Sequence, residues 1–152
     1  MDYHLEARHR AGSPTVCRFS EANVEAIDAS AARLRRWAVV RDVQPQGEPF
    51  LRLGSDARLV VHLPIAGCAD PQAETGIIPG RVQPGHVIVL PDVRFGQISG
   101  LSASLQRWLE RQAGLAGPAE FHAGPRGFAW GELVFPVTAV PRQLRGGLLA
   151  TA

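Results

Sequence analysis

Two stretches of the chain carry the same pattern of apolar and polar positions, and each predicts a strand, a helix and two further strands. In the second stretch, Ile98, Leu105 and Leu109 recur at helical spacing and share one apolar stripe, while the residues between them are mostly polar. We expect strands there at 86–90, 120–123 and 130–137, a turn at 91–92, and a helix that begins by 98 and stops before 114. In the first stretch we expect strands near 15–19, 50–53 and 58–65, and a helix from about 28 to 40.

The two stretches read as copies of one unit. A single shift of the sequence superposes Trp37 on Trp108, and it also matches apolar pairs: Val16 with Val87, Ile27 with Ile98, Leu34 with Leu105, and Phe50 with Phe121. A slip of one residue then aligns Leu63-Pro64-Ile65 with Phe135-Pro136-Val137. We therefore expect one domain over 1–152. Its parts are a first repeat at about 14–65, a connector at 66–85 that can add a short strand at 77–82, a second repeat at about 86–137, and a fraying tail at 138–152.

Each helix has one apolar stripe to bury, so the economical fold is α+β, with both helices on one face of an antiparallel sheet. Strand alternation then divides the side chains between the two faces. The strongly apolar set should face the helices: Leu59, Val61, Leu63, Ile65, Leu133, Phe135 and Val137. The opposite face should carry a mixed set: Arg58, Val60, His62, Trp130, Glu132 and Val134. That mixed face, with one carboxylate, is where we expect the functional site.

Composition excludes several classes of chemistry. The chain is 45% hydrophobic and 20% charged, with a formal net charge of +2, as in a globular protein without a basic nucleic-acid stripe. All 16 basic residues are arginine, which removes lysine Schiff bases and Walker-type phosphate binding. No apolar run is long enough to span a membrane, and residues 1–10 lack the apolar core of a secretory signal. We expect a cytoplasmic protein.

The metal-ligating residue types show no metal spacing. Five histidines are scattered along the chain, and Cys17 and Cys68 stand far apart, so we expect free thiols, no metal and no cofactor. His62 lies in a strand of the first repeat with the same phase as Trp130 and Glu132, and it lines the functional face or has a structural role. Arg33, Arg35 and Arg36 form a basic cluster on the first helix; a solvated face is the ordinary explanation, and an acidic partner is the alternative.

Residues 14 to 137 resemble the GyrI-like small-molecule-binding domains, which also form the effector-binding halves of multidrug-responsive transcription activators. The segments that carry the resemblance are Gly47-Glu48-Pro49-Phe50, Leu63-Pro64-Ile65, the apolar helix with Leu105-Gln106-Arg107-Trp108-Leu109, and Trp130-Gly131-Glu132-Leu133-Val134-Phe135-Pro136-Val137. The last segment looks like the family's acidic strand, in which a glutamate stands four residues before a proline.

The resemblance implies two βαββ units with pseudo-two-fold symmetry and a groove between them for hydrophobic, often cationic, aromatic compounds. Glu132 matches the family's pocket glutamate, which a cationic ligand can neutralise while an aromatic side chain stacks on the ligand. The family's tyrosines are missing, because the only tyrosine is Tyr3, outside the repeats. The expected ligand-binding residues are Glu132, Trp130, His62, Val60, Val134, Trp37 and Trp108, although the last two lie on helix stripes, where a core role competes. Glu132 as a simple exposed sheet residue also stays open.

Three functions follow from this resemblance. The first is a stand-alone bacterial protein that binds a drug or natural product, for sequestration, resistance or sensing. The second is a hydrolase of reactive cyclopropane-bearing natural products, with Glu132 as the catalytic general base. The third is a protein-interaction role of the gyrase-inhibitor type, with a partner that the sequence does not identify. No DNA-binding segment precedes the repeats, so we expect a small hydrophobic or aromatic ligand, no direct DNA binding and no membrane.

Overall fold

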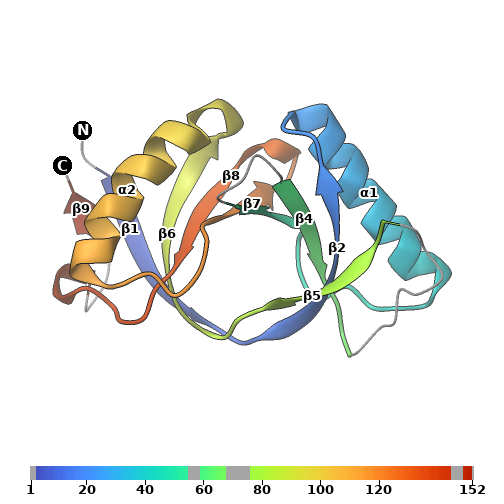
Figure 1. The fold of residues 1–152 in the computed structure, drawn as a ribbon, viewed down its shortest axis with the longest axis horizontal. Helices are drawn as coiled ribbons and strands as arrows, with labels where there is room; N and C mark the ends of the chain where they lie inside the picture. Colours follow the sequence, from blue (N-terminus) through green and yellow to red (C-terminus); the bar gives the residue numbers. More distant parts are fainter. Residues whose placement is uncertain (1–2, 55–58, 68–75, 145–148, 152) are drawn as a thin grey trace. The chain divides into compact units, whose positions relative to one another are not determined.

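The computed structural model describes residues 3–54, 59–67, 76–144 and 149–151. It divides into two compact units: unit 1 comprises Met1–Arg10 and Pro84–Ala152, and unit 2 comprises Ala11–Gln83. Each unit has an antiparallel sheet and one long helix (Figure 1). Arg58 and Cys68, which entered the predictions above, lie outside the described residues.

In unit 2, the strands stand in the order β5-β2-β4-β3. Its elements are β2 (Ser13–Ser20), α1 (Val24–Val40), β3 (Phe50–Leu53), β4 (Leu59–Pro64) and β5 (Ile78–Val82). Helix α1 begins before the expected position, because the side chain of Asn23 caps it by accepting a hydrogen bond from the backbone N–H of Ala26 at 2.8 Å. The short strand expected in the connector is β5, which pairs with β2.

In unit 1, the strands stand in the order β7-β8-β6-β1-β9. Its elements are β1 (Tyr3–Arg10), β6 (Gly85–Arg94), the 3-10 helix η1 (Phe95–Gln97), α2 (Ile98–Gln112), β7 (Glu120–Gly124), β8 (Gly127–Pro136), the 3-10 helix η2 (Arg142–Leu144) and β9 (Leu149–Thr151). Each unit therefore contains the predicted order of strand, helix, strand and strand, and the α+β prediction is confirmed.

The turn expected at residues 91–92 is wrong, because β6 runs through it. The pairing between β6 and β8 shifts between Leu90 and Val93, which is the signature of a β-bulge. Asp92 takes a positive φ of 57° at this point, a conformation that aspartate tolerates better than most residues. The strand therefore bends and continues instead of ending.

Residues 3–10 form strand β1, which the sequence analysis did not predict. Residues 6–10 of β1 pair with residues 85–89 of β6. On its other edge, β1 pairs with residues 149–151, so the fraying expected for the tail does not hold for those residues. Unit 1 thus gains polar side chains from outside the repeats.

The pairing register corrects two of the sequence matches between the repeats. Val16 pairs with Leu63, whose counterpart in the second repeat is Phe135. Phe135 pairs with Ile88 and not with Val87, the residue that the sequence shift matched to Val16. Likewise, Phe50 pairs with His62, whose counterpart in the second repeat is Val134. Val134 pairs with Glu120 and not with Phe121, the residue that the sequence shift matched to Phe50. A slip of one residue moves a side chain to the other face of a sheet. Ile88 and Glu120, one position away from the residues first matched, are therefore the structural counterparts of Val16 and Phe50.

In each unit, the apolar face of the sheet packs on the helix as predicted. Val61 and Leu63 of β4 and Leu133 and Phe135 of β8 are at most 1% exposed. Figure 1 shows α1 and α2 each lying against the sheet of its own unit. The mixed face therefore points away from the helix in both units. The single domain and the groove between the repeats stay predictions. Among the described residues, no helix has the length and apolar character that crossing a bilayer requires.

Candidate ligand-binding face of unit 1

The sheet face of unit 1 that points away from α2 carries a set of charged side chains above an apolar floor. The floor is a buried cluster of Val87 and Val89 from β6 and Val134 from β8. The predicted trio of Trp130, Glu132 and Val134 alternates along β8 and therefore shares this face. Strand β1, paired to β6, places further side chains on the same side of the sheet.

Glu132 is ion-paired and not a lone carboxylate. Arg8 of β1 donates from Nη1 to Oε2 of Glu132 at 2.9 Å, and the same guanidinium also binds Glu6. The hydrogen bond to Glu132 raises the pKa of Arg8 above its ordinary value, although partial burial opposes the shift. The side chains of Arg8 and Glu132 are 45% and 38% exposed, so water screens their attraction. Exposed ion pairs of this kind contribute about 0–1 kcal/mol to stability. Another cation could therefore displace Arg8 from Glu132 at little cost.

A second carboxylate, Glu120 of β7, is held much more firmly. Arg10 of β1 donates to both oxygens of Glu120, at 2.7 and 2.9 Å, and Nε2 of His122 lies 2.8 Å from Oε1. Only 2% of the Glu120 side chain is exposed. Burial raises its pKa, but the hydrogen bonds from Arg10 and His122 outweigh burial and lower the pKa to about 2. Glu120 therefore stays ionised at neutral pH and anchors β1 to β7.

Trp130 lies at the exposed part of this face. It is 47% exposed, and it pairs across the sheet with Arg94 of β6. The guanidinium carbon of Arg94 stands 4.5 Å from the centre of the Trp130 ring, which is a cation–π contact. The ring of Trp130 is thus already used by the protein to hold a planar cation.

Two of the predicted ligand-binding residues, Val60 and His62, belong to unit 2 and share one face of β4. His62 is 3% exposed, its Nδ1 lies 2.8 Å from the hydroxyl of Thr15, and its ring stacks on Phe50 with the centroids 4.9 Å apart. A Cβ added at Gly80 would come within 2.9 Å of the His62 ring, so β5 closes over it. These contacts fix the imidazole within the packing of unit 2, and its contact with a ligand stays a prediction.

The two helix tryptophans lie on the other side of their sheets from the predicted site residues. Trp37 of α1 is 3% exposed and belongs to the core between α1 and the sheet of unit 2. Trp108 of α2 is half-buried in unit 1. Neither shares a sheet face with the β8 trio or with Val60 and His62, and a ligand contact for either of them stays a prediction.

Sequence reasoning missed Arg8, Arg10 and Glu120. A signal for the first two was present, because Leu5 and Ala7 alternate with charged residues in the period-two pattern of a strand. Glu120 lay in a strand that was predicted correctly, but its match to the wrong residue of the first repeat hid its place on the functional face. The expectation that this sheet face carries one carboxylate is wrong, since Glu6, Glu120 and Glu132 all form ion pairs with arginines of β1.

Comparison with solved structures supports the same fold. The EcmrR C-terminal domain superposes with a TM-score of 0.64 and 13% identity, covering 92% of this chain and 100% of that chain. EcmrR in a complex with DNA superposes with a TM-score of 0.68 and 9% identity, covering 91% of this chain, which spans 59% of that chain. A hydrolase from Listeria innocua gives 0.55 and 11%, covering 88% of this chain and 90% of that chain. No protein-family model and no curated protein matches the sequence. The predicted GyrI-like fold is confirmed by these likenesses.

Proposed function

We propose that this protein binds small aromatic cations on the open sheet face of unit 1, with Glu132 and Trp130 as the central contacts. The observation that carries the proposal is that the protein's own arginines already occupy both groups. Arg8 pairs with Glu132, and Arg94 lies over Trp130. A carboxylate and an aromatic ring on one strand, each holding a planar cation, are the elements that recognise a cationic aromatic ligand.

Binding would proceed by exchange. An incoming cation would take the place of Arg8 at Glu132, and the displaced guanidinium would keep its second partner, Glu6. The exposed Arg8–Glu132 pair is weak, so its loss costs little. The ligand's aromatic part would in turn displace Arg94 from the ring of Trp130 or stack beside it. The Glu120 network would hold β1 and β7 in place during the exchange.

The biological role we propose is sequestration or sensing of a drug or natural product in a bacterial cytoplasm, with resistance as one outcome. The resemblance to effector-binding domains supports this role, and so does the likeness of the fold to the EcmrR C-terminal domain. Val134 and its neighbours supply the apolar floor that the hydrophobic part of such a ligand requires.

Isothermal titration with ethidium and crystal violet tests the proposal, with a neutral aromatic compound of similar size as the reference ligand. We expect Glu132→Gln to weaken cation binding by about tenfold, since it removes a charge-assisted contact. Arg8→Gln should tighten the same binding, because it removes the internal competitor for Glu132. Glu110→Gln on α2 is the matched control, since Glu110 is exposed and accepts a hydrogen bond from the side chain of Gln106.

Opposite shifts in the two variants distinguish exchange from a general effect of charge on stability. If neither dye binds the wild type, or if both variants weaken binding, the proposal is wrong. Hydrolysis stays a competing prediction: turnover of a reactive cyclopropane compound that Glu132→Ala abolishes, with circular dichroism unchanged, would replace simple binding. If the protein leaves the DNA supercoiling activity of gyrase unchanged, the gyrase-inhibitor role is excluded.

A further inference from the structure

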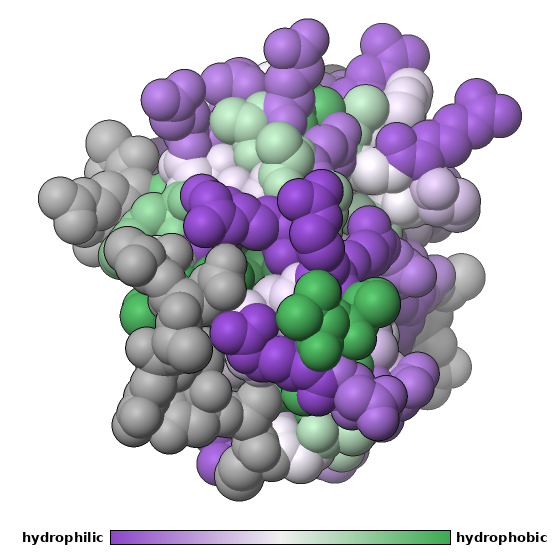
Figure 2. All heavy atoms as spheres, turned by 90° about the vertical axis from the view of Figure 1, so that its right-hand side faces the viewer, coloured by the Kyte–Doolittle hydropathy of each residue, from purple (hydrophilic) through white to green (hydrophobic). Residues whose placement is uncertain are grey.

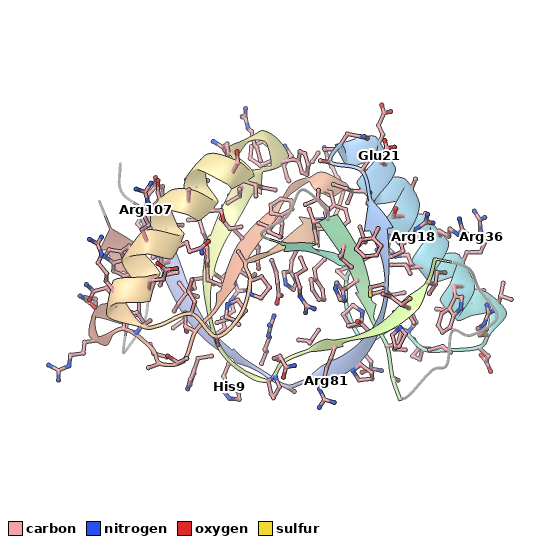
Figure 3. All side chains as sticks on the ribbon, in the orientation of Figure 1. His9, Arg18, Glu21, Arg36, Arg81 and Arg107 are labelled. Atoms are coloured by element: carbon pink, nitrogen blue, oxygen red, sulfur yellow. The ribbon has the colours of Figure 1, made fainter. Side chains whose placement is uncertain are left out.

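A pocket beside α1 in unit 2 is lined mostly by cationic and small side chains. It has a volume of about 500 Å³, within the range of small-molecule sites. The end of β2 contributes Arg18 and Phe19, followed by Glu21, and α1 contributes Arg33 and Arg36. Figure 3 shows Arg18 and Arg36 on the side of unit 2 where α1 lies. This pocket is separate from the charged face of unit 1 described above.

Local sequence explains why a hollow forms at this place. The turns of α1 that face the end of β2 carry Ala26, Ala29 and Ser30, whose small side chains leave space. Strand β5 pairs with β2 only as far as Cys17, so Arg18 to Ser20 have no partner in β5. The pocket therefore opens where the helix is narrow and the sheet loses a strand.

A second pocket of about 330 Å³ adjoins the first, because Arg33 and Arg36 line both. It adds Trp37, the exposed Val40, and Arg41, whose guanidinium carbon lies 5.0 Å from the Trp37 ring centre. Figure 2 shows this side of unit 2 as a mostly hydrophilic surface with a hydrophobic patch among the polar residues. The two pockets therefore share arginines where they adjoin, and the smaller pocket adds the apolar surface of Trp37 and Val40.

The lining of the larger pocket carries an excess of positive formal charge. Three arginines and Glu21 give its lining a net formal charge of +2. Within the described part of the chain, neither Arg18 nor Arg36 forms an ion pair with a carboxylate, whereas the neighbouring Arg35 pairs with Glu48 at 2.8 Å. Burial, and then repulsion from Arg33, lower the pKa of Arg18 from its ordinary value. An anion in the pocket would relieve this repulsion.

Two buried donors without acceptors belong to the same pair of pockets. Among the residues that the structure describes, the buried side-chain nitrogen and oxygen atoms without a hydrogen-bond partner are Nε of Arg18 and Nε1 of Trp37. Buried donors are rarely left unpaired in native proteins, and each one calls for an explanation. Arg18 lines the first pocket, and its Nε is a donor that an oxyanion could satisfy, whereas Trp37 lines the second pocket.

The fold itself does not require this cluster. In unit 1, the positions equivalent to Arg18 and Arg33 carry Leu90 and Ser104, and only Arg36 has a basic counterpart, Arg107. Arg107 instead donates to the backbone carbonyl of Ala103. The basic pocket is therefore a property of unit 2 alone, and Arg107 offers a matched control on an equivalent helix position.

We propose that the paired pockets beside α1 bind a small organic oxyanion, a phosphate or a carboxylate on an aromatic or aliphatic body. Arg18, Arg33 and Arg36 would hold the oxyanion, and Trp37 with Val40 would contact the organic part. The pocket's size favours a small molecule over a flat acidic protein surface.

Titration calorimetry with naphthyl phosphate, naphthoate, inorganic phosphate and uncharged naphthol tests the proposal. We expect the naphthyl anions to bind, naphthol to bind at least about tenfold more weakly, and the affinity to fall with added salt. Comparing naphthyl phosphate with naphthoate decides between the two anions. Arg36→Gln and Arg18→Gln should each weaken anion binding by about tenfold. Glu21→Gln should tighten it, since that substitution removes the one opposing charge of the pocket.

Arg107→Gln and Glu132→Gln should leave anion binding unchanged, and the latter separates this proposal from cation binding in unit 1. The proposal would be overturned by no anion binding up to about 5 mM, by equal weakening in Arg36→Gln and Arg107→Gln, or by no effect of Glu21→Gln on binding. A short DNA duplex that binds through the same arginines while naphthyl phosphate does not would also refute a small-molecule site. Arg36 is exposed, so its variant tests the site without disturbing the core.

Discussion

The buried carboxylate of Glu120 should make the stability of unit 1 depend on acid. Glu120 is 1% exposed and is held by Arg10 and His122, and its pKa falls from an ordinary 4.5 to about 2. A lowered folded-state pKa means that the unfolded chain takes up the proton first. The stabilisation is therefore complete above the unfolded pKa and is lost as the pH falls from about 4.5 through about 2.

The magnitude follows from the shift. One pKa unit corresponds to about 1.4 kcal/mol, so a shift of this size contributes about 3 kcal/mol to the free energy of unfolding at neutral pH. The side chain is almost fully buried, so solvent screening does not reduce the figure as it would for a surface pair. Glu120→Gln removes the titrating group and should remove most of this contribution.

Urea unfolding followed by circular dichroism between about pH 6 and pH 2 measures the effect. We expect the wild type to lose about 3 kcal/mol more than Glu120→Gln over this range. Glu48→Gln is the control, because Glu48 forms an exposed pair with Arg35 in unit 2. If the units unfold in separate transitions, the effect should fall in the transition of unit 1. Parallel pH profiles for the wild type and Glu120→Gln would refute the reasoning.

Three further predictions concern packing. His62→Ala should lower the free energy of unfolding by about 2–4 kcal/mol in urea, since it removes the Thr15 hydrogen bond and the stack on Phe50, whereas exposed His9→Ala should change it by less than about 0.5. Gly131→Ala should destabilise by more than about 2 kcal/mol, because its Cβ would collide with the carbonyl oxygen of His122, while Gly96→Ala, with open space around it, should be tolerated; equal thermal midpoints would contradict this. Burial raises the pKa of Cys17 to about 11, so in a Cys68→Ser background alkylation by iodoacetamide near pH 8 should be about a hundredfold slower in the native protein than in urea, and equal rates by mass spectrometry would show the thiol to be accessible.

The sequence by itself determined the elements of the repeats. Helical spacing located α1 and α2, and alternation placed Trp130, Glu132 and Val134 on one face of β8, because both signals depend only on neighbours along the chain. The bulge at Leu90–Val93 was not predicted, since Pro91-Asp92 looks the same in a turn and in a bulged strand. The match of Phe50 with Phe121 was wrong for a related reason. Two residues of the same type can be aligned in sequence even where the strand register has shifted by one position.

Only the tertiary structure decided which charges meet. Arg8 and Arg10 are more than one hundred residues from Glu132 and Glu120, and they reach these carboxylates because β1 adds to the edge of β6. No local pattern encodes that pairing, since it depends on which sheet edge remains open after the repeats have folded. The basic pocket beside α1 has the same origin: Arg18 and Arg36 come from a strand and a helix, and their meeting depends on the small residues of α1. Local periodicity thus specified the elements, and long-range pairing specified the chemistry of both sites.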